Sequence, residues 1–235
     1  MSAIFYGIGV GPGDPELLTH KATRILGQVD VIIAPKSRDD RASLALQIVQ
    51  AYLRPQVTVH TLLFPMTYEQ ETLDAAWQEI IQTITKALDQ GQSVAFITLG
   101  DPMLYSTYIY MHKLVQAQNY PTEIIPGIPS FCAAAARTGQ PLAEGKEHLT
   151  IVPAISESDD LDSLFAQADN LVLMKVYKEK DQIIDRLEKH GLKDQATLIS
   201  RCGLDGEIIV NNLDEIRSKP VNYLSLILAR RKPQK

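Results

Sequence analysis

Glycine and proline residues are concentrated near the N-terminus, in segment 7–15 (GIGVGPGDP), directly after an apolar run. Glycines between a strand and a helix allow the backbone to approach a phosphate or another ligand closely. Gly7 and Gly9 have the spacing of a dinucleotide-binding loop, but the next glycine of that loop would fall at position 12, which is Pro12. The acidic residue expected about 20 positions further on is also missing. These residues disfavour a site for NAD, and the alternative is a tight strand-to-helix turn.

A second candidate follows the apolar segment 93–99, where Gly100, Asp101 and Pro102 come in sequence. Ligands of open α/β sheets bind at the carboxyl ends of the strands, so a carboxylate here is well placed for function. Asp101 could accept a proton, or a hydrogen bond from an amine. The alternative is a helix N-cap with Pro102 at the first helical position. The two roles are compatible, and these residues alone leave the choice open.

A third candidate is segment 126–131 (PGIPSF), which precedes an alanine-rich stretch. Proline and glycine end a predicted strand here, and a helix restarts near Ser130. The Ser130 hydroxyl and the aromatic ring of Phe131 would together suit a ribose or an adenine. The alternative is a tightly packed turn without a ligand.

Composition excludes several classes of function. The five histidines show no metal-ligand spacing, and the net charge of −5 disfavours nucleic-acid binding. No stretch reaches the roughly 18 to 20 apolar residues of a membrane span, and no signal peptide is evident at the N-terminus. Two cysteines, Cys132 and Cys202, are too few for a disulfide framework. We therefore expect a cytoplasmic protein without a bound metal, a membrane span or a nucleic-acid partner.

Strands and helices alternate along the first half of the chain. Apolar runs predict strands at 3–8, 30–35, 57–63 and 93–99, and helical periodicity predicts helices from Pro15 onward, at 41–53 and at 73–88. Asp14 is the expected N-cap of the first helix. This alternation is typical of parallel βαβ units.

The second half has shorter elements. Strands are predicted at 122–125, 149–152, 171–176, 197–200, 207–210 and 223–229, several of them antiparallel, and a helix at 130–137. A polar stretch that ends in Pro121 suggests a boundary, which divides the chain into domains 1–118 and 119–235. The expected architecture is two α/β domains with a ligand cleft between them.

The three glycine-containing segments together resemble the tetrapyrrole methylase family. The motifs are GxGxGPGDPELLTxKA at 7–22, GDPxxYS at 100–106 and PGIPSFxAAAARxGxPL at 126–142. The resemblance continues through 170–178, 200–204 and 223–228, and so covers nearly the whole chain. Within the family, the segments GDPMLYSTY and LVLMKVYK look like those of enzymes that methylate C-20 of precorrin-2 or cobalt-factor II in cobalamin biosynthesis.

This resemblance implies a two-domain α/β fold that binds S-adenosylmethionine, with S-adenosylhomocysteine as product, in a non-Rossmann manner. Pro12, with Gly11 and Gly13, would border the tetrapyrrole. Asp101 is the candidate base for removing the C-20 proton, with the positioning of cofactor or backbone as the alternative. The residues implied to contact the cofactor are Leu99, Gly100, Asp101, Leu104, Tyr105, Ser106, Ser130, Phe131, Lys175, Val176, Gly203, Tyr223 and Leu224.

A tetrapyrrole substrate carries many carboxylates, so we expect basic residues near it despite the net negative charge. Lys36, Arg38 and Arg41 are the first choices, although such side chains are commonly solvated surface charges. Family members pair as homodimers, and the same is expected here. The alternatives are a methylase for another corrin position, for the sirohaem branch, or for RNA or a protein side chain. An alternative of another class is a non-catalytic nucleotide-binding module.

Overall fold

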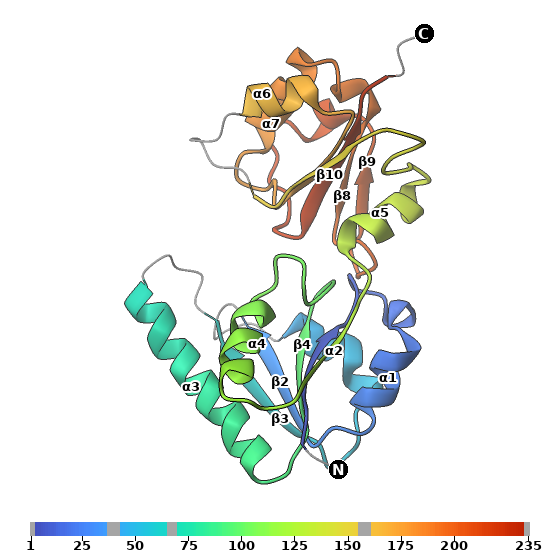
Figure 1. Ribbon diagram of the computed structural model, residues 1–235. Helices are drawn as coiled ribbons and strands as arrows, with labels where there is room; N and C mark the ends of the chain where they lie inside the picture. The colour runs from blue at the N-terminus through green and yellow to red at the C-terminus, as the bar shows by residue number, and fades with distance from the viewer. Residues whose placement is uncertain (1–2, 37–42, 65–69, 155–160, 233–235) are drawn as a thin grey trace. The chain divides into compact units, whose positions relative to one another are not determined.

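The computed structural model describes residues 3–36, 43–64, 70–154 and 161–232. The chain divides into two compact units, Met1–Pro129 and Ser130–Lys235, each with its own five-stranded sheet (Figure 1). This boundary falls eleven residues later than the predicted one after residue 118. Strand β5 (Thr122–Ile125) pairs with β1 (Phe5–Gly9), and this long-range pairing places β5 in the first unit.

The sheet of the first unit is parallel throughout, as the alternation of elements predicted. Its strand order is β3-β2-β4-β1-β5. Strand β1 therefore lies between β4 and β5, and the carboxyl ends of these three strands are neighbours. The other strands are β2 (Val31–Lys36), β3 (Thr58–Leu63) and β4 (Val94–Thr98).

Helices cover both faces of this sheet (Figure 1). One apolar core lies between the sheet and the helices α1 (His20–Leu26) and α2 (Leu44–Val49). A second core lies on the opposite face, under α3 (Gln70–Asp89) and α4 (Tyr108–Ala117). The inner strands β1, β2 and β4 are buried from both sides, which explains why they appear in the sequence as continuous apolar runs, whereas edge strand β3 is largely exposed.

Helix α1 begins later than the sequence predicted. Asp14 caps a short 3-10 turn, Pro15–Leu17, and the helix itself starts after Thr19. The Thr19 hydroxyl accepts the N–H of Ala22 at 3.2 Å. Two good capping residues thus stand close together, and extended Leu18 separates the elements that they begin. The predicted helix at 41–53 is likewise shorter, because α2 passes into a 3-10 turn after Val49.

Tyr108 fills the centre of the second core. Its ring lies between those of Phe5 and Phe96, with centroid distances of 5.6 and 5.7 Å. The ring passes directly over Gly7, where a Cβ atom would overlap the phenol carbons. Burial raises the pKa of the Tyr108 hydroxyl, which contacts Nδ1 of His112 at 3.2 Å. Gly7 is therefore required for packing, a reason that its place in the glycine-rich motif did not indicate.

The second unit contains a mixed sheet with the order β6-β7-β10-β8-β9. Strand β10 lies at the centre, antiparallel to β7 and β8, and β6 runs parallel to β7. The antiparallel pairing predicted for this half is confirmed. The strands are β6 (Leu149–Val152), β7 (Asn170–Met174), β8 (Ala196–Ser200), β9 (Ile208–Val210) and β10 (Ser225–Arg230).

Helices α6 (Leu161–Gln167) and α7 (Lys180–Lys189) pack on one face of this sheet and enclose the core of the second unit. Helix α5 (Ser130–Thr138) lies on the other face, as Figure 1 shows, and contacts β10. The helix predicted at 130–137 is confirmed.

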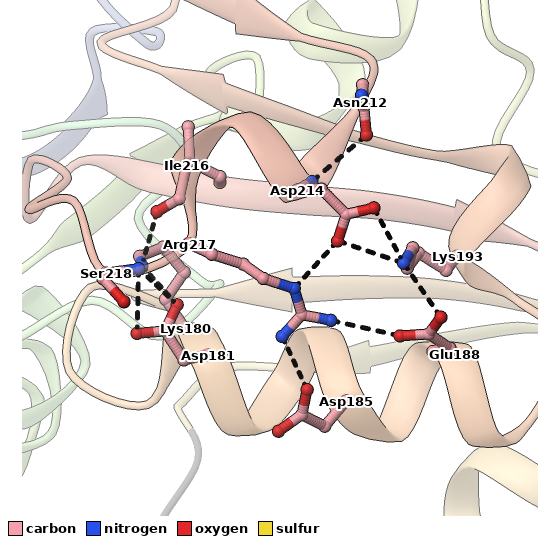
Figure 2. A network of polar contacts seen from close by, with 10 residues as sticks. All are labelled: Lys180, Asp181, Asp185, Glu188, Lys193, Asn212, Asp214, Ile216, Arg217 and Ser218. Carbon is pink, nitrogen blue, oxygen red and sulfur yellow. Dashed lines mark hydrogen bonds and ion pairs between the residues drawn. The ribbon is translucent and has the colours of Figure 1, made fainter.

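A polar network ties α7 to the segment before β10 (Figure 2). The ammonium of buried Lys180 donates to the carbonyl oxygen of Ile216 at 2.7 Å and to Asp181 at 2.6 Å. Arg217 bridges Asp185 on α7 and Asp214 on the segment, at 2.6 and 2.8 Å. Lys180 is the buried member of this network, so its hydrogen bonds contribute more than those of the exposed ion pairs.

The packing of Gly7 against Tyr108 predicts that Gly7→Ala destabilises the protein. The added methyl group overlaps a buried ring that Phe5 and Phe96 hold in place, so we expect a loss of about 1–3 kcal/mol in unfolding free energy. Urea titration followed by circular dichroism measures it. Gly27→Ala is the control, because there the nearest atoms to a Cβ lie at 3.6 Å and φ is −74°. Equal midpoints for the two variants would contradict the packing described.

The network of Figure 2 predicts that Lys180→Met also destabilises the protein. Methionine has a similar length but removes the charged donor of both hydrogen bonds, to Ile216 and to Asp181, which costs about 1–3 kcal/mol. The Ile216 carbonyl then keeps only the N–H of Lys219, at 3.1 Å. Lys189→Met is the matched control, since Lys189 pairs with Asp162 at 3.0 Å while its side chain is 63% exposed. Thermal unfolding should show a clear decrease in Tm for Lys180→Met and almost none for the control. An unchanged Tm for Lys180→Met would show that the buried ammonium does not stabilise the fold.

Candidate functional site

Three glycines from three loops meet at the carboxyl end of the first sheet. Gly9 ends β1, Gly100 follows β4 and Gly127 follows β5. A Cβ atom on Gly9 would lie 2.5 Å from the carbonyl oxygen of Gly100 and 2.6 Å from the nitrogen of Gly127. A Cβ atom on Gly127 would overlap the same carbonyl oxygen. We call this arrangement the glycine contact; it leaves no room for a side chain at Gly9 or Gly127.

Backbone hydrogen bonds strengthen the link between the first two loops. Gly11 and Gly100 form an isolated antiparallel bridge, with N–H to carbonyl distances of 3.3 and 2.8 Å. Both residues have positive φ, +74° and +68°, a conformation that favours glycine. The structure thus brings together the first and second sequence motifs, which lie about ninety positions apart.

Asp101 joins the second and third motifs. One oxygen of its carboxylate accepts the N–H of Met103 at 2.8 Å, and the other accepts the N–H of Gly127 at 3.1 Å. The expected helix N-cap at Asp101 is wrong, because residues 101–107 form an irregular turn and α4 begins only at Tyr108. Asp101 instead fixes its own turn and holds the loop of Gly127 against it.

Ser106 directs its hydroxyl into the protein. Its Oγ lies 2.9 Å from Oγ1 of Thr98 and accepts the N–H of Tyr108 at 3.1 Å. Ser106 and Thr98 are both buried, at 8% exposure. Ser106 therefore anchors the end of the 101–107 turn to β4 and α4, and its hydroxyl is already engaged with the protein.

The same turn presents two large side chains to solvent. Met103 and Tyr105 are each 50% exposed, and Tyr105 has a φ of +52°. A non-glycine residue in this conformation costs about 1–3 kcal/mol, and such strain is typical of functional segments. Leu104 and Leu99 are half-buried beside them. Of the residues implied to contact the cofactor in this turn, Tyr105 is the one with the most accessible side chain.

The residues expected near the substrate are only partly described. Gly11, Pro12 and Gly13 are buried in the first unit. Lys36 is the half-buried last residue of β2. Arg38 and Arg41 lie outside the described residues.

In the second unit, five residues implied to contact the cofactor lie in the segments that follow β7 and β8 or precede β10, at one end of these strands. Strand β10 is antiparallel to β7 and β8, so its first residues lie beside the last residues of both. The N–H of Arg201 donates to the carbonyl oxygen of Leu224 at 2.9 Å. Arg201 and Lys175 both have positive φ, +55° and +53°. The five residues are Lys175, Val176, Gly203, Tyr223 and Leu224.

An aromatic pair lies at the same end of these strands. The rings of Tyr177 and Tyr223 meet edge to face, with centroids 5.3 Å apart. Burial raises the pKa of the Tyr223 hydroxyl, and the ammonium of Lys178 lies 5.8 Å from the Tyr177 ring. Val176, which precedes Tyr177 in the chain, is buried at 1% exposure. Val176 thus packs in the core of the second unit, where a ligand would meet its backbone rather than its side chain.

Ser130 and Phe131 begin α5. Ser130 is half-buried, whereas Phe131 is 6% exposed. The interpretation of Phe131 as an open aromatic surface for adenine is therefore not favoured by its packing, whereas Ser130 is more exposed.

Sequence reasoning did not identify several residues that hold these segments. Thr98 was treated as part of an apolar strand, although a hydroxyl at a strand end beside Gly-Asp-Pro is a polar signal. The predicted strand 207–210 includes Glu207 without giving its side chain a role, and Tyr177 directly follows the predicted strand 171–176. Glu207 lies within four residues of Gly203 and contacts it, a proximity that the sequence shows but whose geometry it does not.

The described part of the chain also bears on metal binding and on membrane insertion. Among these residues no group of three or more His, Cys, Asp or Glu side chains is arranged to hold a metal ion. None of the described helices combines the length and the apolar character that crossing a membrane requires.

Comparisons with known proteins agree with the motifs. The chain is 38% identical over 229 residues to the cobalt-precorrin-2 C(20)-methyltransferase of Salmonella typhimurium, covering 97% of this chain and 96% of that protein. It is 37% identical over 231 residues to the probable cobalt-precorrin-2 C(20)-methyltransferase of Methanocaldococcus jannaschii, covering 96% and 95% of the two chains.

The fold also has solved counterparts. The uroporphyrin-III C-methyl transferase of Thermus thermophilus, complexed with S-adenosylhomocysteine, superposes with a TM-score of 0.67 at 24% identity, covering 97% of both chains. A family model for tetrapyrrole (corrin/porphyrin) methylases matches residues 5–217. With a family match over most of its length and two full-length relatives above 30% identity, the chain belongs to the tetrapyrrole methylase family.

Proposed function

We propose that this protein transfers a methyl group from S-adenosylmethionine to C-20 of precorrin-2, or of its cobalt-containing counterpart, in cobalamin biosynthesis. The observation that carries the proposal is the 38% identity to the Salmonella cobalt-precorrin-2 C(20)-methyltransferase over 97% of the chain. The relative from Methanocaldococcus jannaschii has the same named position of methylation and a similar identity of 37%. Both relatives carry cobalt in the substrate name, which favours the cobalt-containing form.

The 99–106 loop fits a cofactor of this kind. A Cβ atom at Gly100 would find only Pro129 Cα and Ile128 O within 4 Å, so the backbone here is open on one side. The half-exposed ring of Tyr105 stands on the same loop. S-adenosylmethionine supplies an electrophilic methyl group, and its amino acid and adenosine parts need polar backbone groups and a flat apolar surface. This loop offers both.

Methyl transfer to a ring carbon makes its main demand on alignment. Holding two reactants in the correct geometry can supply about 7 kcal/mol or more of the activation barrier. The glycine contact, Asp101 and Ser106 together hold the backbone of the 99–107 loop from both ends. We propose that this rigid loop is what aligns the methyl donor.

Asp101 acts in this proposal as a positioning residue. Both of its oxygens already accept backbone N–H groups, those of Met103 and Gly127. A base that removed the C-20 proton would need one of these oxygens free to face the substrate. The geometry therefore favours the positioning alternative over the catalytic base.

Lys36, with Arg38 and Arg41, is proposed to meet substrate carboxylates, and Gly11 to Gly13 are proposed to support the wall next to the tetrapyrrole. We also propose that the protein works in the cytoplasm as a homodimer. The exposed apolar side chains of edge strand β9, Ile208 at 56% and Ile209 at 39%, support pairing because such edges favour association.

Direct assay of methyl transfer tests the function. We expect the purified protein to transfer label from S-adenosylmethionine to cobalt-factor II or precorrin-2, and NMR of the product to place the new methyl group at C-20. Isothermal titration should show binding of S-adenosylhomocysteine and none of NAD. A methyl group at another ring position would assign the protein to a different branch of the family. Binding of NAD without S-adenosylhomocysteine would overturn the proposal altogether.

Substitution of Asp101 tests its role. In Asp101→Asn one oxygen is replaced by an NH₂ group that cannot accept a backbone N–H, so a positioning residue loses one hydrogen bond. We expect the affinity for S-adenosylhomocysteine to fall about 5- to 30-fold, the equivalent of about 1–2 kcal/mol. A catalytic base would instead leave this affinity intact and lower kcat by about 10²- to 10⁴-fold.

Asp30→Asn is the matched control for this substitution. Its two oxygens also accept donors, the N–H of Ser93 at 2.9 Å and the guanidinium of Arg54 at 3.0 Å. These contacts lie at the amino ends of β2 and β4, whereas Asp101 lies beyond the carboxyl ends of the strands. Asp30→Asn should therefore alter stability without altering the affinity for S-adenosylhomocysteine.

A further inference from the structure

Glu207 occupies a special place in the second unit. It follows the 201–206 loop, which leaves β8 and returns to β9. This loop has three residues with positive φ: Arg201 at +55°, Gly203 at +74° and Gly206 at +78°. Positive φ strains Arg201, while the two glycines adopt it freely and add flexibility, so this loop needs external support to keep one conformation. The side chain of Glu207 provides it and is itself only 16% exposed.

The two oxygens of Glu207 accept donors from different parts of the unit. One accepts the N–H of Gly203 at 2.8 Å, and the other accepts Nε of Arg137 at 2.8 Å. Arg137 lies in the last turn of α5, the helix that begins with Ser130 and Phe131. A single carboxylate therefore connects the Gly203 loop to the helix that begins with Ser130, another residue that the resemblance implies to contact the cofactor.

The electrostatics keep this carboxylate charged. The N–H of Gly203 and the guanidinium of Arg137 hold the pKa of Glu207 below its ordinary value. Burial, with the charge of Glu207 adding to it, raises the pKa of the adjacent Cys202 thiol to about 11. At neutral pH the thiol thus stays protonated and Glu207 stays an acceptor.

The two contacts of Glu207 differ in strength. The Arg137 side chain is 65% exposed, and exposed ion pairs contribute little. The bond from the Gly203 N–H reaches an ionised oxygen of a side chain that is only 16% exposed, which makes it the stronger kind of hydrogen bond. The hold on Gly203 is therefore the main contribution, and Arg137 orients the carboxylate that makes it.

We propose that Glu207 is a positioning residue for S-adenosylmethionine: with its carboxylate oriented by Arg137 of α5, it fixes the Gly203 loop in the conformation that binds the methyl donor. This inference rests on the proposed function of the chain. Glu207 acts on the cofactor through Gly203 and does not take part in the chemical step.

The test is Glu207→Gln, measured by titration with S-adenosylhomocysteine and by steady-state kinetics. Glutamine keeps one accepting oxygen, but its NH₂ group faces either the Gly203 N–H or Arg137 Nε and cannot accept from it. We expect Kd for S-adenosylhomocysteine and KM for S-adenosylmethionine to rise together about 5- to 30-fold, with kcat changed less than about 2-fold. A purely structural role would lower the amount of active protein and leave KM unchanged.

Two further variants complete the experiment. Glu207→Asp keeps the charge but is shorter by one methylene group, so it cannot reach both donors, and Kd should rise by a smaller factor. Glu188→Gln is the matched control: its carboxylate pairs with Arg217 and Lys193, both at 3.1 Å, in the network of Figure 2, and Kd should not change.

The outcomes separate this inference from the function on which it rests. If the wild-type protein does not bind S-adenosylhomocysteine, both the proposed function and this inference are overturned. If the wild-type protein binds it and folded Glu207→Gln and Glu207→Asp bind it equally well, the inference alone is overturned. A common rise in Kd for both Glu207 variants and for Glu188→Gln would also overturn it, because the effect would then be general to charge removal in the second unit.

Discussion

The close approach of backbone at Gly9, Gly100 and Gly127 is the constraint on which the first unit depends. Loops from three neighbouring strands share a volume that leaves no room for a Cβ atom at two of these positions. Dense packing of this kind transmits any displacement to its neighbours. The orientation of the following turn, including Asp101 and the strained Tyr105, is therefore determined by where the strands end. A loop built in this way is preorganised for the cofactor binding that we propose.

Each unit then uses one carboxylate to join segments that the sheet alone leaves separate. Asp101 accepts N–H groups from its own turn and from the loop of Gly127, while Glu207 accepts from Gly203 and from Arg137 of α5. A carboxylate suits this task because it has two accepting oxygens and, when charged, makes stronger hydrogen bonds than a neutral group. The same engagement makes these residues poorly suited to proton removal, since each oxygen is already directed at a donor within the protein.

The sequence predicted the strands well and the ends of the helices poorly. Strands such as β1 and β4 are buried on both faces, so their positions follow from continuous apolar runs. The start of α1 was missed because Asp14 and Thr19 are both good caps, and choosing between them depends on tertiary packing. The domain boundary was placed too early for a similar reason. The pairing of β5 with β1 is a long-range contact, and the polar stretch before Pro121 carries no sign of it.

The site was predictable as a set of motifs, but the roles of its residues were not. Ser106 stands in a motif implied to contact the cofactor, yet its hydroxyl faces Thr98 inside the protein. Glu207 stands outside every motif core, yet its carboxylate accepts the N–H of Gly203. In both cases the role depends on a side-chain direction that local sequence does not specify. For a reaction that requires mainly alignment, the residues that hold the backbone matter as much as those that contact the ligand. Such residues appear in a sequence only as turn formers and isolated charges, so their function becomes visible when the hydrogen bonds that they make are known.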